Sequence, residues 1–100
     1  MFDVVYNSGS RKEYQSLDGS QKIIIDKGIN RIKARGTQAG EQLQGELKKC
    51  YKFKNRRAGL RMVFRQLEDR IEVIQIVATG KRDKSEVYKN AIRRLDKKSH

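Results

Sequence analysis

Residues 50–65 read CYKFKNRRAGLRMVFR, and this stretch decides the fold. Aromatic side chains alternate with lysines over residues 51–54, and after a short turn apolar side chains alternate with arginines over residues 60–65. A period of two predicts two half-buried β-strands, each with one apolar and one cationic face. Because Gly59 suits a left-handed turn residue, we expect the two strands to form an antiparallel hairpin.

Two further strands are predicted on either side of this hairpin in the sequence. Residues 71–79 are apolar at positions that fall on both faces of a strand, which indicates a central strand of a sheet. The pair Glu68-Asp69 supplies the tight turn before it. Near the N-terminus, residues 2–6 alternate in the manner of a half-buried strand.

Two helices are predicted before the hairpin from apolar positions three or four residues apart. The first covers about residues 9–17, and Ser10 with Glu13 three residues later resembles a capping box at its start. The second runs from Ser20 to near Gly36, with three isoleucines on one stripe.

A third helix is predicted over about residues 84–96, with Asp83 as its N-cap. Its apolar stripe consists of Tyr88, Ala91, Ile92 and Leu95. The element order is therefore β-α-α-β-β-β-α, which is an α+β domain with helices packed on a largely antiparallel four-stranded sheet. A chain of 100 residues forms a single domain of this kind, spanning residues 1–100. The strand order stays open.

Composition narrows the cellular setting. No run of about 18 apolar residues and no secretory leader pattern is present in the sequence, so we expect a cytoplasmic protein that does not associate with membranes. A lone cysteine, Cys50, cannot form an internal disulfide and is expected to pack in the core. With His100 as the single histidine, no metal site is expected, and no cofactor either.

The charge distribution points to a polyanionic partner. The chain has 24 Lys and Arg against 12 Asp and Glu, and residues 48–100 hold 17 of these cations and 6 of the acids. The segment from Lys48 to Arg65 contains eight cations and no acid. A solvated surface normally mixes both signs, so this field favours nucleic acid. The candidate RNA-binding residues are Lys48, Lys49, Arg56, Arg57, Arg65, Lys81 and Lys84.

The cationic face of the hairpin is also a candidate for RNA cleavage. Lys52, Lys54 and Arg61 converge there if the strands pair as predicted. Metal-independent attack by the RNA 2′-OH needs a base, a cation for the phosphorane and an acid for the leaving oxygen. The basic patch contains no carboxylate in sequence, so a lysine whose neutral form is favoured by neighbouring cations would be the base.

The other candidate roles follow from residue type. Arg61 presents a planar fork suited to the transition state, and Arg82 lies in a loop from which it can approach the leaving group. Tyr88 has two interpretations, because its apolar stripe favours packing whereas an exposed ring could stack on a nucleobase. A purely solvated sheet face is the structural alternative for all the cations.

Two stretches of the sequence resemble the RelE toxin family. One is Leu43-Gln44-Gly45 followed by the hairpin described above. The other, Gly80-Lys81-Arg82-Asp83-Lys84-Ser85-Glu86-Val87-Tyr88, continues to Ala91-Ile92-Arg93-Arg94-Leu95 and is similar to the family's Gly-Lys-Arg-x-x-Ser-Glu-Val-Tyr end. The resemblance implies a toxin of a type II toxin–antitoxin system, an endoribonuclease that cuts mRNA in the A site of the ribosome, beside the 16S rRNA. It also implies a cognate antitoxin partner, which often displaces the C-terminal helix or buries the basic face.

The functional positions of the family fall on Lys52, Lys54, Arg61, Arg82 and Tyr88 of this chain. By resemblance, a lysine is the base, Arg61 stabilises the transition state, Arg82 is an acid or phosphate clamp, and Tyr88 stacks on the mRNA. One departure is Gln44, where family members often carry arginine.

Two alternatives remain beside this interpretation. A ParE-like inhibitor of DNA gyrase would share the fold, but it would not be expected to keep the five functional residue types. A degenerate toxin that binds RNA without cutting it would be compatible with Gln44.

Overall fold

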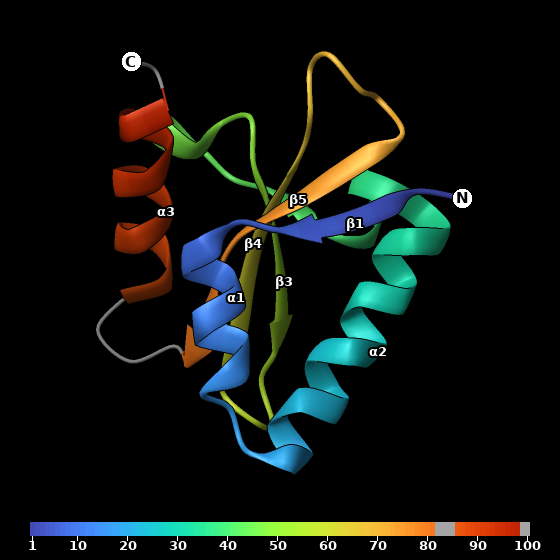
Figure 1. The fold of residues 1–100 in the computed structure, drawn as a ribbon, viewed down its shortest axis with the longest axis vertical. Helices are drawn as coiled ribbons and strands as arrows, with labels where there is room; N and C mark the ends of the chain where they lie inside the picture. The colour runs from blue at the N-terminus through green and yellow to red at the C-terminus, as the bar shows by residue number, and fades with distance from the viewer. Residues whose placement is uncertain (82–85, 99–100) are drawn as a thin grey trace.

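A five-stranded sheet with helices on both of its faces forms the centre of the molecule (Figure 1). The computed structural model describes residues 1–81 and 86–98. The helices and strands are β1 (Asp3–Tyr6), α1 (Ser8–Gln15), α2 (Gly19–Arg35), β2 (Glu41–Gln42), β3 (Tyr51–Asn55), β4 (Leu60–Gln66), β5 (Val73–Lys81) and α3 (Glu86–Lys98). Two short 3-10 helices, η1 (Gly36–Ala39) and η2 (Gly45–Leu47), flank β2.

The strands lie in the order β1-β5-β4-β3-β2. β1 runs parallel to β5, and every other neighbouring pair is antiparallel. The predicted α+β class and element order are confirmed, but the predicted number of four strands is wrong. The fifth strand, β2, has two residues, which are too few to produce a recognisable alternation.

The hairpin of β3 and β4 forms as the alternation predicts. Tyr51 lies opposite Phe64 and stacks on it with ring centroids 6.0 Å apart. Gly59 has a φ of 67°, the left-handed conformation that the turn requires. Tyr51 and Phe53 of β3 and the alternate apolar residues of β4 therefore face the same side of the sheet, whereas Val63 faces the opposite side.

The core consists of two clusters of buried side chains, one on each face of the sheet. The larger, which we call the α2-side cluster, contains Leu17, Ile25, Ile29, Ile32, Leu60, Met62, Phe64, Ile74 and Ile76. The smaller, which we call the α3-side cluster, contains Leu47, Cys50, Val63, Val77, Ala78, Val87 and Ala91. The sheet is thus buried on both sides over its middle, which explains why apolar residues of β5 fall on both of its faces.

A bulge in β5 supplies part of the second cluster. Val63 pairs with Ala78, but the next residue of β4, Phe64, pairs with Ile76, so Val77 is an extra residue on β5. The bulge turns both Val77 and Ala78 into the α3-side cluster. The predicted start of this strand at residue 71 is wrong, because β5 begins at Val73 and Ile71 is 69% exposed before it.

The helix starts differ from the predicted ones in one important case. Asn7, not Ser10, is the N-cap of α1, and Ser10 occupies the third helical position of a reciprocal capping box. Asp18 caps α2 in the same way with Gln21. The predicted N-cap of α3, Asp83, lies outside the described residues. None of the described helices combines the length and the apolar character that a crossing of a membrane requires.

Gly28 in the middle of α2 provides a test of this packing. A Cβ at position 28 would lie 2.7 Å from Cε2 of Phe53, so the helix and the ring must separate. We expect Gly28→Ala to lower the free energy of unfolding by about 1–2 kcal/mol, because overpacking outweighs the better helix propensity of alanine. Gly19→Ala, with no atom within 4 Å, is the matched control and should leave stability unchanged or slightly higher. Urea unfolding of both variants measures the difference, and equal stabilities would contradict the described contact.

Candidate nucleic-acid interface

Three cations lie together on the outer side of the β3–β4 hairpin. Lys54 pairs directly with Arg61, and Lys52, which pairs with Val63, lies diagonally across from Arg61 on the same face. Directly opposed residues of an antiparallel pair have Cβ atoms about 4.5–5.5 Å apart. All three side chains are partly buried. We call Lys52, Lys54 and Arg61 the cation cluster.

The cation cluster includes a carboxylate neighbour that the sequence did not predict. Glu41 in β2 pairs with Lys52, and its Oε1 lies 3.8 Å from Nζ of Lys54. The expectation of a patch without a carboxylate is therefore wrong. The segment 48–65 indeed lacks acids, but the sheet brings one from an earlier part of the chain. The side chain of Glu41 is 66% exposed and that of Lys54 is 25% exposed, so Glu41 can move away more easily than Lys54.

Arg61 has donors available for a ligand. Its Nη1 donates to the carbonyl oxygen of Leu60 at 3.2 Å. Its backbone is fixed separately, because the carbonyl of Arg61 accepts a hydrogen bond of 3.1 Å from the hydroxyl of Thr79 in β5. The guanidinium thus sits on a central strand whose backbone is hydrogen-bonded to β5.

Tyr88 lies in the first part of α3 and is partly buried against the α3-side cluster. The preceding residue, Val87, is so close to Gly80 that a Cβ at position 80 would lie 3.4 Å from its Cγ2. Gly80 is the β5 partner of Arg61. One side of the Tyr88 ring therefore packs on the α3-side cluster, as the packing interpretation predicts. The residue lies at the end of α3 that is nearest to Arg61.

The remaining basic residues fall at two ends of the hairpin rather than on one surface. Arg56 and Arg57 are exposed in the turn after β3, and Lys81 is exposed at the end of β5, so these three flank the cation cluster. At the other end lie Lys48, Lys49 and Arg65.

Local partners hold two of the residues at that distant end. Nζ of Lys49 is 3.0 Å from a carboxylate oxygen of Glu68, and Nε of Arg65 donates to Oε1 of Gln75 at 3.0 Å. Arg82 and Lys84 lie outside the described residues.

Cys50 has the environment of a core residue. Cys50 is fully buried in the α3-side cluster, and burial raises the pKa of its thiol. This is the expected position of a packing residue. Among residues 1–81 and 86–98, no three His, Cys, Asp or Glu side chains are grouped so that they could hold a metal ion.

Similar proteins exist among curated proteins and solved structures, although no protein-family model matches the chain. A RelE-like toxin protein of Escherichia coli is 31% identical over 94 residues, which are 94% of this chain and 97% of that protein. The mRNA interferase toxin RelE of Escherichia coli strain K12 is 27% identical over 90 residues, covering 90% of this chain and 93% of that toxin.

Solved structures of a RelE mutant from Escherichia coli agree with this similarity. In its free state the mutant has a TM-score of 0.79 at 25% identity, covering 94% of this chain and 97% of the mutant. Bound to a peptide of the antitoxin RelB, it has a TM-score of 0.70 at 25% identity, with coverages of 90% and 93%. The similarity in sequence and fold thus extends over nearly the whole chain, and the chain belongs to the family of RelE-type toxins.

Proposed function

We propose that this chain is the toxin of a type II toxin–antitoxin pair and that it cuts messenger RNA in the ribosomal A site. The observation that carries the proposal is the cation cluster, in which Lys54 and Arg61 face each other across the hairpin with Lys52 beside them. Membership in the RelE-type family supports the choice of RNA as the polyanion. The chain would act in the cytoplasm, where ribosomes are found.

The cleavage step needs a base for the 2′-OH, a cation for the developing negative charge and an acid for the leaving oxygen. Lys52 or Lys54, acting as the base, takes the proton from the RNA 2′-OH, and the 2′ oxygen forms a bond to phosphorus. Arg61 binds the non-bridging oxygens as charge develops on them. The bond from phosphorus to the 5′ oxygen then breaks, leaving a 2′,3′-cyclic phosphate and a 5′-OH. By resemblance we assign to Arg82 the transfer of a proton to the leaving 5′ oxygen. Tyr88 is assigned, also by resemblance, to stacking on a base of the mRNA.

Dependence on the ribosome has a physical rationale in the shape of the site. The cation cluster consists of partly buried side chains on a sheet, and the chain by itself supplies charge but nothing that orients a flexible RNA strand. Attack by the 2′-OH requires it to be in line with the leaving oxygen, a geometry that free RNA rarely adopts. A ribosome that holds the mRNA would supply this orientation, and well-oriented reactions gain roughly 7–11 kcal/mol over free encounter.

An antitoxin is the proposed protein partner. The related RelE mutant has been solved with a peptide of the antitoxin RelB. With a formal net charge of +12, this chain would attract an acidic segment, and such a segment would compete with RNA for the same cations.

The two alternative functions are less well supported. The relatives are named mRNA interferases, which favours RNA cleavage over inhibition of gyrase. Gln44 is exposed just before η2, and loss of cleavage with retention of RNA binding would be the mark of a degenerate toxin.

Removal of Arg61 tests the proposed chemistry. We expect Arg61→Ala to slow A-site cleavage by about 10²–10³-fold, because one donor to the developing negative charge is lost. Arg70→Ala, which removes an exposed arginine from the turn before β5, should cleave at the wild-type rate. Primer extension in a translation extract maps the cut, with ribosome-free mRNA as the blank. Equal cleavage by both variants would remove Arg61 from the site.

Glu41 gives a second test because it competes with phosphate for Lys54. We expect Glu41→Gln to bind a short single-stranded RNA about two- to fivefold more tightly at low salt, since an exposed ion pair contributes little but its acid repels the ligand. Glu72→Gln makes the same change of charge far from the cation cluster and is the control. Fluorescence anisotropy at several salt concentrations measures both, and equal affinities would show that Glu41 does not face the RNA.

A further inference from the structure

One edge of β5 is covered by side chains instead of a strand. β1 pairs with β5 only from Val73 to Ile76, and beyond that point α1 lies along the same edge. The hydroxyl of Ser10 donates to the carbonyl of Ile76 at 2.7 Å, and Nδ2 of Asn7 donates to the carbonyl of Val77 at 3.1 Å. These bonds bring the start of α1 to the border between the two faces of the sheet.

An ion pair joins α1 to α3 around this edge. Nη1 of Arg94 is 2.8 Å from Oε1 of Glu13, and Nη2 is 2.9 Å from Oε2, a bidentate geometry. Both side chains are about a fifth exposed, at 23% and 21%. We call this pair the Glu13–Arg94 clamp.

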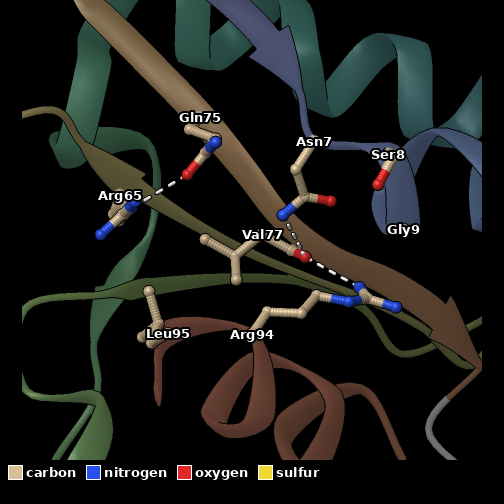
Figure 2. A pocket seen from close by; sticks show the side chains of 8 residues that line it. All are labelled: Asn7, Ser8, Gly9, Arg65, Gln75, Val77, Arg94 and Leu95. Carbon is tan, nitrogen blue, oxygen red and sulfur yellow. Dashed lines mark hydrogen bonds between the residues drawn. The ribbon is translucent and has the colours of Figure 1, made fainter. Parts of the chain in front are cut away.

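Further hydrogen bonds fix the Glu13–Arg94 clamp to the sheet and to α3. The backbone N–H of Thr79 donates to Oε1 of Glu13 at 3.0 Å, and Nδ2 of Asn90 donates to Oε2 at 3.1 Å. Nη1 of Arg94 also donates to the carbonyl of Val77 at 2.8 Å (Figure 2). One carboxylate thus accepts four hydrogen bonds from β5 and α3, so a change at Glu13 acts on both.

Gly9 in α1 is independent evidence that the sequence specifies this contact. A Cβ at position 9 would lie 2.5 Å from Cζ of Arg94, so only glycine leaves room for the guanidinium against the helix backbone. Glycine is unfavourable within a helix, and at position 9 it leaves room for the guanidinium of Arg94. Figure 2 shows Arg94 reaching past Val77 toward this part of the chain.

The clamp matters because α3 is held by a narrow apolar contact and carries Tyr88. Val87 and Ala91 are its buried apolar residues, and Tyr88, Ile92 and Leu95 are only partly buried. Arg94 lies six residues after Tyr88, which is roughly 9 Å along a helix. A helix fixed near one end by a bidentate pair keeps its rotation and its angle, so the ring of Tyr88 stays at the end nearest to Arg61.

We propose that Glu13 and Arg94 are positioning residues for RNA cleavage, which hold α3 so that Tyr88 stays beside the cation cluster. This inference rests on the proposed function for the part that concerns Tyr88. The part that concerns α3 stands on the contacts alone. Without the clamp, α3 lifts from the sheet more often, and the stacking surface for the RNA base moves with it.

Cys50 is a natural reporter for the docking of α3. It is the one cysteine in the sequence, it is fully buried in the α3-side cluster, and burial raises the pKa of its thiol. A thiol reagent therefore reaches it when the α3-side cluster opens or when the chain unfolds. We expect Arg94→Gln and Glu13→Gln to raise the labelling rate under native conditions by about tenfold or more.

Matched variants separate this local opening from general damage. Lys89→Gln removes one positive charge from an exposed position of the same helix and should leave labelling unchanged. Gly9→Ala keeps both charges but displaces the guanidinium, and should raise labelling as Arg94→Gln does. Urea unfolding of each variant gives its global stability. A labelling rate that rises only in proportion to lost global stability would overturn the local opening of α3.

A double-mutant cycle with Tyr88 tests positioning. In A-site cleavage on programmed ribosomes, we expect Arg94→Gln to lower kcat about tenfold with KM within about twofold of wild type. In a Tyr88→Ala background the same substitution should lower kcat no further, because the ring that Arg94 positions is gone. Equal losses in both backgrounds would mean that Arg94 acts only on the fold and would overturn the proposal. If the wild-type chain does not cleave, the proposed function and the positioning of Tyr88 fall together, whereas Cys50 labelling still decides whether the clamp holds α3.

Discussion

The alternation of side chains along β3 and β4 is the constraint on which the rest of the structure depends. One face of the hairpin carries Tyr51, Phe53 and Met62 into the α2-side cluster, and the opposite face carries the cation cluster. A shift of the pairing by one residue would exchange these two sets. The register that buries the aromatic rings is therefore the same register that assembles the candidate site, and stability and function select one arrangement.

Charge is distributed along this framework with little local neutralisation. Lys54 and Arg61 face each other directly, and Glu41 offers only a loose contact at 3.8 Å to one of them. Opposed like charges destabilise a strand pair. Burial of the two apolar clusters on either side of the sheet offsets this unfavourable electrostatic free energy. At the far end of the hairpin the chain provides close partners for Lys49 and Arg65.

Local periodicity explains how far the sequence could predict the structure. The hairpin, both long helices and the convergence of Lys52, Lys54 and Arg61 on one face follow from periods of two and 3.6 within short windows. The strand β2, the bulge at Val77 and the N-cap Asn7 could not be predicted in this way. β2 is too short to show an alternation, the bulge leaves the apolar run of β5 unbroken, and Ser10 with Glu13 imitates the capping pattern that Asn7 forms with Ser10.

The candidate site divides along the same line. The cation cluster lies within one hairpin and was predictable, whereas Glu41 and Glu13 reach their partners through contacts between distant segments. Glu13 and Arg94 are 81 positions apart, and no window of sequence relates them. Gly9 is a local signal of this contact, because a glycine within a helix often marks a close approach of another group.

The parallel pairing of β1 with β5 affects how the chain can fold during its synthesis. Asp3 lies beside Val73, so the first strand to be synthesised has its partner in the last. β5 is flanked by β1 and β4, and neither the five-stranded sheet nor the α3-side cluster can close before β5 has left the ribosome. Contacts of such long sequence separation form slowly. A newly made chain thus remains without its complete sheet until β5 has emerged, although β1 to β4 are already available.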